Sequence, residues 1–128
     1  MKTPFKRNLK MYRNYVCPYC FYQINKCICK VYPPYALIQI DEGIQEIVRE
    51  LNRKGYKTKY SCEGHFDYSY NIYIKFYEKY NFPKLPKGFT KSDFVIEHIM
   101  TETDNEDKFN QEKKEYLSLL KEWVKSLN

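Results

Sequence analysis

Four cysteines lie close together near the start of the chain, and their spacing is typical of metal ligands. The pattern is Cys17-Pro-Tyr-Cys20, six further residues, and then Cys27-Ile-Cys29. Two thiolates three residues apart can face one ion from a tight turn, and a Cys-x-Cys pair can complete a tetrahedron from the other side. Free thiols or a redox pair are the alternatives, but redox Cys-x-x-Cys motifs open a helix in a thioredoxin-like unit, which this segment lacks. We therefore expect these four cysteines to bind one structural zinc ion in an N-terminal zinc knuckle.

The turn after each cysteine pair departs from the usual zinc knuckle. Such turns favour glycine because the backbone adopts a positive φ there, yet Phe21 and Lys30 occupy the two positions. Four thiolates would leave no open coordination position, so the expected role is to hold a short segment together rather than to catalyse a reaction.

A second group of reactive side chains is Ser61-Cys62-Glu63-Gly64-His65, which follows a predicted strand. Cys62 could act as a nucleophile with His65 as its base. Cys62 and His65 could instead share a second metal with His98, or the loop amides and His65 could bind an anion, with Gly64 allowing close approach. The remaining alternative is that Cys62 is a core residue and His65 caps a turn.

Two helices are expected to flank these residues. Ile44, Ile47, Val48 and Leu51 have the spacing of a one-sided helix over residues 42–54, with Asp41 as its N-cap and Gly55 after its end. A longer helix should start after Asp104 and run to the C-terminus. Its apolar stripe consists of Phe109, Tyr116, Leu117, Leu120, Trp123, Val124 and Leu127.

Four segments have strand-like patterns: residues 35–40, 56–62, 70–77 and 94–100. In the second, Tyr56, Thr58, Tyr60 and Cys62 are expected on one face and Lys57, Lys59 and Ser61 on the other. The proline-containing residues 81–89 should lack regular structure. The sequence thus predicts an α+β fold with a single four-stranded, largely antiparallel sheet packed by two helices. Residues 1–33 would form a basic arm with the zinc knuckle, and residues 34–128 the core domain.

Charge is divided unevenly along the chain. The net charge is +6 over 128 residues, and residues 1–40 contain seven Lys and Arg without any Asp or Glu. Lys6, Arg7, Lys10 and Arg13, interleaved with aromatic residues, could contact nucleic acid, although such arms are often only solvated. Further along, Tyr73 and Lys75 lie on the polar face of a predicted strand. Tyr73 could stack on a base and Lys75 could bind phosphate, or both could simply belong to a solvent-exposed sheet face.

The chain shows neither a signal peptide nor an apolar run of transmembrane length, so we expect a cytoplasmic protein without membrane contact. No acidic pair, triad, P-loop or dinucleotide motif is present. Oligomeric state is left open, and a homo-oligomer is one alternative.

The block from Asp41 to Gly64, including Gly55-Tyr56 and Ser61-Cys62, resembles the tRNA wybutosine-synthesising methyltransferase family. That resemblance implies binding of S-adenosylmethionine. The Cys-Pro-x-Cys knuckle, together with the Ser-Cys-x-Gly-His segment, is also similar to small uncharacterised proteins of Firmicutes and their phages. This second resemblance implies a binding role, such as phage counter-defence by sequestering nucleotide signals.

Our leading prediction is a non-enzymatic zinc protein that binds a nucleotide-like anion. Its expected ligand-binding residues are Ser61, Cys62, Glu63, Gly64, His65, Tyr73 and Lys75. The alternatives are a nucleic-acid- or protein-binding regulator that acts through the basic arm, and a methyltransferase-like enzyme that uses the Ser61–His65 loop.

Overall fold

The computed structural model describes residues 13–23, 25–29 and 37–128. The described elements are the strands β1 (Tyr15–Val16) and β2 (Ile38–Gln39), a 3-10 turn η4 (Glu42–Ile44) and helix α1 (Gln45–Arg53), then β3 (Thr58–Cys62), β4 (Asn71–Phe76), β5 (Thr90–Ser92), β6 (Val95–Ile99) and helix α2 (Glu106–Ser126). Both predicted helices are present, and Gly55 has a φ of 97° directly after the first, as its predicted position requires.

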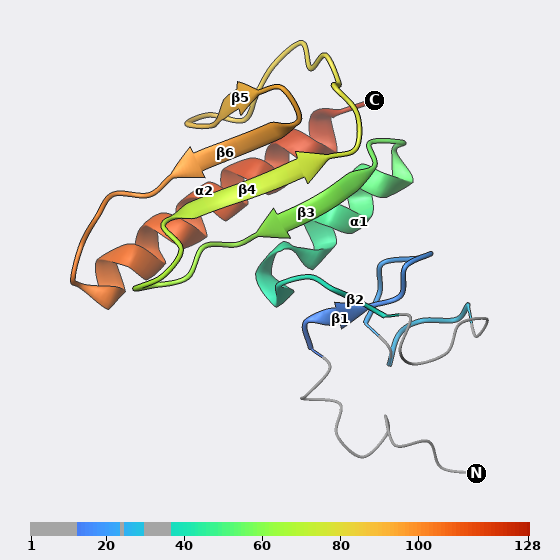
Figure 1. Cartoon of the computed structure of the whole chain (residues 1–128), viewed down its shortest axis with the longest axis horizontal. Helices are drawn as coiled ribbons and strands as arrows, with labels where there is room; N and C mark the ends of the chain where they lie inside the picture. Colours follow the sequence, from blue (N-terminus) through green and yellow to red (C-terminus); the bar gives the residue numbers. More distant parts are fainter. Residues whose placement is uncertain (1–12, 24, 30–36) are drawn as a thin grey trace.

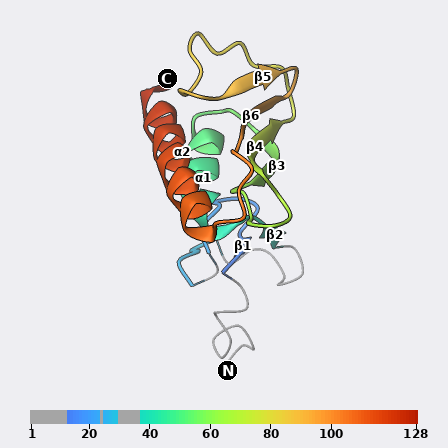
Figure 2. The same cartoon turned by 90° about the vertical axis from the view of Figure 1, so that its left-hand side faces the viewer.

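A four-stranded antiparallel sheet forms the centre of the molecule, in the order β3-β4-β6-β5 (Figure 1). Both helices cover the same face of this sheet (Figure 2). The alternation predicted for residues 70–77 places Ile72, Ile74 and Phe76 against the helices, where they are buried with Phe109 and Leu120. Burial of these apolar side chains is the main stabilising contribution to the core.

The membership of this sheet differs from the prediction in one strand. Residues 38–39 do not join it but pair with Tyr15–Val16 in a separate two-stranded sheet. The fourth strand is β5, which follows the irregular proline-containing segment and forms a hairpin with β6. Three residues are too few to produce a readable alternation, so sequence patterning missed β5.

β3 contains an irregularity that changes which side chains share a face. Thr58 pairs with the core residue Phe76, whereas Cys62 pairs with Tyr73 on the opposite face, and the register shifts between Thr58 and Tyr60. A bulge inserts one residue and so reverses the alternation beyond it. The prediction that Thr58 and Cys62 lie on one face was therefore wrong, and Cys62 points away from the helices.

The described part of the N-terminal arm, residues 13–23 and 25–29, packs against α1 below the sheet (Figure 1). Gln45 is the main link: it is only 5% exposed, and its amide nitrogen donates to the backbone oxygens of Arg13 and Ile40 while its oxygen accepts from Gln23. Val16 is fully buried in the same core cluster as α1 and the sheet. The arm thus contacts the core domain across the predicted division at residues 33 and 34.

Neither helix in the described ranges has the combination of length and hydrophobicity that a bilayer span requires.

Candidate functional site

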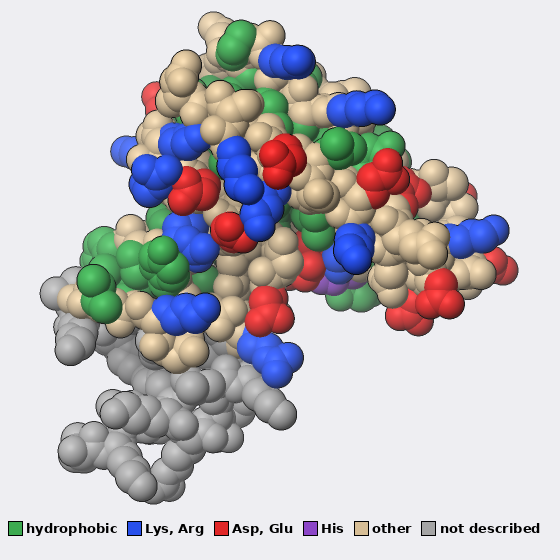
Figure 3. Space-filling model, turned by 180° about the vertical axis from the view of Figure 1, so that it is seen from behind, with side chains coloured by type: hydrophobic (Ala, Val, Ile, Leu, Met, Phe, Trp, Pro, Cys, Tyr) green, Lys and Arg blue, Asp and Glu red, His purple; other side chains and the backbone are tan. Residues whose placement is uncertain are grey.

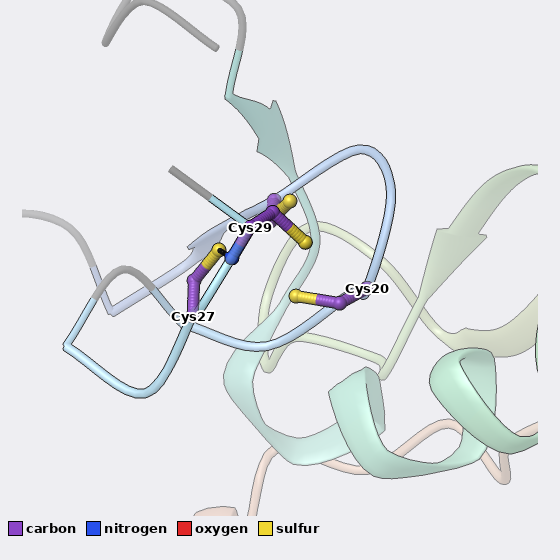
Figure 4. A group of neighbouring side chains, drawn as sticks. Cys20, Cys27 and Cys29 are labelled. Atoms are coloured by element: carbon purple, nitrogen blue, oxygen red, sulfur yellow. Dashed lines mark hydrogen bonds between the residues drawn. The ribbon is translucent and has the colours of Figure 1, made fainter. Parts of the chain in front are cut away.

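The four cysteines of the arm form one compact cluster, hereafter the cysteine cluster. The sulfur atoms of Cys17, Cys20, Cys27 and Cys29 all lie within 4.8 Å of one another. The three labelled in Figure 4 point toward a common centre. Cys17 is fully buried, and none of the five cysteines of the chain forms a disulfide. This arrangement could hold a metal ion.

The turn that presents these thiols uses an unusual residue. Phe21 has a φ of 61°, which is the left-handed conformation expected at the glycine position of a knuckle. Its amide donates to the carbonyl of Cys17 at 2.9 Å, which closes the turn, and its ring packs against the hydrophobic core. Packing of the phenylalanine side chain offsets backbone strain that a glycine would avoid.

Backbone amides support the sulfur atoms. Tyr19 N–H donates to the sulfur of Cys17 at 3.3 Å, and Cys29 N–H donates to that of Cys27 at 3.4 Å. Partial exclusion of water and the three neighbouring thiols raise the pKa of Cys29 to about 12, and water exclusion also raises the pKa of Cys20. A cation at the centre would favour the thiolates that the amides already solvate, so metal binding must release protons.

A second cluster lies at the end of β3 and consists of Asp41, Cys62 and His65, hereafter the Asp41 cluster. One potential ligand atom from each residue lies within 4.8 Å of the other two. His65 Nε2 is 2.9 Å from Asp41 Oδ2, and the side chains of His65 and Asp41 are 25% and 19% exposed. The sequence predicted Asp41 only as a helix cap, but its side chain makes no cap hydrogen bond.

His98 does not join this cluster. Its ring nitrogens lie 2.9 Å from the carbonyl oxygen of Gly88 and 2.8 Å from the carboxylate of Glu112 on α2. The third potential metal ligand beside Cys62 and His65 is therefore Asp41, and not His98 as the sequence suggested. Asp41 and His65 are 24 residues apart, so only folding reveals the pair.

The amides of the Ser61–His65 loop are largely engaged within the protein. Glu63 N–H donates to Asp41, Gly64 N–H to the sulfur of Cys62, and His65 N–H to the carbonyl of Ser69. The Glu63 carboxylate is 3.2 Å from Lys113 Nζ. With a carboxylate facing His65 and its donors in use, this loop offers little to an anion.

A groove lies beside the Ser61–His65 loop, between the arm and the outer edge of β3. Its volume is about 810 Å³, and its walls are residues 18–22 of the arm, residues 38–40, the polar side of α1 and residues 57–61, with Tyr73 and Tyr77. β3 is an edge strand, so this side of it pairs with no other described strand of the sheet. We refer to this feature as the groove.

The side chains of the groove are aromatic and basic. Five tyrosines line it, namely Tyr19, Tyr22, Tyr60, Tyr73 and Tyr77, together with Arg49, Arg53, Lys57 and Lys59 and a single carboxylate, Glu50. Arg53 is paired with Glu50 at 2.6 Å. Arg49 lies 4.0 Å above the Tyr22 ring. Lys57 and Lys59 form no salt bridge with any other residue that the structure describes.

The predicted site residues therefore fall into separate places. Ser61 and Tyr73 line the groove, whereas Cys62 and His65 belong to the Asp41 cluster and Lys75 lies on the open sheet face opposite Tyr60. Burial, with Cys62 and Asp41 nearby, raises the pKa of Tyr73, so its hydroxyl stays a donor at neutral pH. Arg13 is exposed, and Lys6, Arg7 and Lys10 lie outside the described residues.

Comparisons of the chain with models of protein families, with curated proteins and with solved structures found no match. The functional assignment therefore depends on the chemistry of the residues themselves.

Proposed function

We propose that the cysteine cluster holds a structural zinc ion and that the groove beside it binds a nucleotide-like anion without converting it. Zinc is favoured over other ions by four thiolate ligands with amide support and no open position. Its role is to fix the arm, which supplies one wall of the groove.

The observation that carries the ligand assignment is the imbalance of charge in the groove. Four cationic side chains face one carboxylate, and that carboxylate is occupied by Arg53. Lys57 and Lys59 remain to meet an anion, and Lys59 lies 5.7 and 5.8 Å from the ring centroids of Tyr60 and Tyr77. Phosphate oxygens are the ligands that such a pair of ammonium groups favours.

The tyrosines favour a ligand with an aromatic base attached to its phosphate. Tyr60 and Tyr77 are 59% and 60% exposed, which leaves their rings accessible for stacking. A base stacked on such a ring contributes about 1–3 kcal/mol. The groove volume also lies within the range of small-molecule sites and is well above the size of a free phosphate.

The test is calorimetric titration with ATP, with a dinucleotide and with inorganic phosphate. We expect a nucleotide to bind, phosphate to bind far more weakly, and the double substitution Lys57→Ala, Lys59→Ala to weaken nucleotide binding by about tenfold or more. The matched control is Lys84→Ala, Lys87→Ala, which removes the same charge from an exposed loop outside the groove and should change affinity less than about twofold.

Equal loss of affinity in both double variants would mean that net charge, not the groove, attracts the ligand. Binding of a single-stranded oligonucleotide alone, with a steep salt dependence, would instead favour nucleic acid as the partner. The basic arm and the methyltransferase-like chemistry stay predictions from the sequence.

A further inference from the structure

The Asp41 cluster brings together three different metal-binding side chains outside the cysteine cluster. A carboxylate oxygen of Asp41, the sulfur of Cys62 and a ring nitrogen of His65 lie within 4.8 Å of one another. They come from the start of η4, the end of β3 and the loop that follows. Cys62 is 9% exposed, and the two other side chains are partly exposed, so an ion could reach the site without unfolding.

Each ligand is held in place by a neighbouring group. The amide of Glu63 donates to Asp41 Oδ2 at 3.1 Å, and the amide of Gly64 donates to Cys62 Sγ at 3.4 Å. Ser69 Oγ lies 3.3 Å from the same sulfur and hydrogen-bonds to Asn71. His65 stacks on Tyr68 with ring centroids 5.0 Å apart. Outer contacts of this kind orient the ligands of metal sites and stabilise their anionic forms.

We propose that Asp41, Cys62 and His65 form a second metal site, which takes a zinc-like divalent ion and is distinct from the cysteine cluster. Mixed oxygen, sulfur and nitrogen donors suit zinc better than magnesium or calcium, which prefer oxygen alone. Binding releases the thiol proton of Cys62 to solvent and uses the lone pair of a neutral His65. The thiolate and the carboxylate then balance the two charges of the ion.

Such a site differs from the cysteine cluster in its coordination. Three protein ligands leave one position of a tetrahedral ion open to water or to an exogenous anion, whereas four thiolates close it. The bulge in β3 is what makes the site available, because it turns Cys62 away from the helices toward Asp41 and His65.

The experiment counts metal ions on the full chain by native mass spectrometry after equilibration with zinc, and repeats the titration with Co²⁺. We expect about two zinc ions per wild-type chain. We expect about one in each of Asp41→Asn, Cys62→Ser and His65→Gln, with the cobalt–thiolate absorption of the cysteine cluster retained. Asp41→Asn keeps an acceptor for the Glu63 amide, and circular dichroism checks that each variant folds.

The matched control is His98→Gln, which removes the other histidine of the chain. It should still bind about two ions, because His98 contacts Gly88 and Glu112 rather than the Asp41 cluster. The proposal is overturned if the wild-type chain saturates at one ion, or if the number of bound ions is unchanged in all three ligand variants. In either case His65 and Asp41 form a hydrogen-bonded pair without a metal ion. Neither result would affect nucleotide binding in the groove.

Discussion

At the scale of single residues, Gly88, which lies two residues before β5, combines a positive φ with a close aromatic neighbour. Its φ is 82°, a Cβ there would overlap the ring of Tyr116, and its carbonyl accepts a hydrogen bond from His98. The Tyr116 ring cannot yield easily because it is stacked on His98 with centroids 3.5 Å apart. We expect Gly88→Ala to lower the free energy of unfolding by about 3 kcal/mol, from backbone strain and displaced packing together. Urea denaturation measures this.

Gly55 is the matched control for that substitution. Its φ of 97° is equally unfavourable for alanine, but no atom lies within 4 Å of an added Cβ. Gly55→Ala should therefore cost about 1 kcal/mol from backbone strain alone. If the two substitutions lower the free energy of unfolding equally, the contact with Tyr116 does not contribute to the effect of Gly88→Ala.

At the scale of elements, α2 begins one residue later than the sequence indicates. Asp104 was the predicted cap, but Asn105 holds the position, and its side-chain oxygen accepts from Lys108 N–H at 3.0 Å. We expect Asn105→Ala to destabilise the protein by about 1 kcal/mol in thermal or urea unfolding, because one amide of the first turn loses its partner. Asp104→Ala should change stability much less.

Asn110 provides the control within the same helix. It is exposed in the second turn, where asparagine is a poorer helix former than alanine. Asn110→Ala should leave stability unchanged or raise it slightly, and a loss as large as that of Asn105→Ala would contradict the capping role.

At the scale of the whole molecule, the arm and the core domain depend on different forces. The helices and the sheet share an apolar core, whereas within the described residues of the arm only Val16 and Cys17 are buried apolar side chains. Cationic and acidic side chains intermingle over the helical face, while apolar side chains gather beside the residues drawn in grey (Figure 3). We therefore expect a metal ion bound by the cysteine cluster to contribute more to the order of the arm than to that of the core domain.

If the cysteine cluster holds a metal ion, its removal should loosen the arm and spare the core domain. In Cys27→Ser, or after chelation, we expect amide hydrogen exchange in residues 13–23 and 25–29 to accelerate on the order of 100-fold, while α2 stays protected. Nucleotide binding should fall as well, because residues 18–22 form a wall of the groove.

The pH dependence gives a further check on the same site. Because the pKa of Cys29 lies near 12 without metal, protons must leave on binding, and zinc affinity should rise with pH. Affinity that is independent of pH, or protection that persists in Cys27→Ser, would contradict a metal role for the cluster.

Some features of this protein can be read directly from the sequence because they depend on neighbours along the chain. The four cysteines lie within 13 residues, so their spacing alone brings them close together. The helix-spaced apolar residues and the alternation of residues 71–76 likewise predict both helices and the central strand, because these periods reflect which side of one element is buried.

Other features depend on contacts between distant segments, and only the tertiary structure decides them. The bulge at Thr58–Tyr60 moves Cys62 to the other face of the sheet, and packing of η4 brings Asp41 to His65. The groove takes its walls from the arm, α1 and the edge of β3. None of these follows from a local period, because each requires knowing which elements lie side by side and in which register.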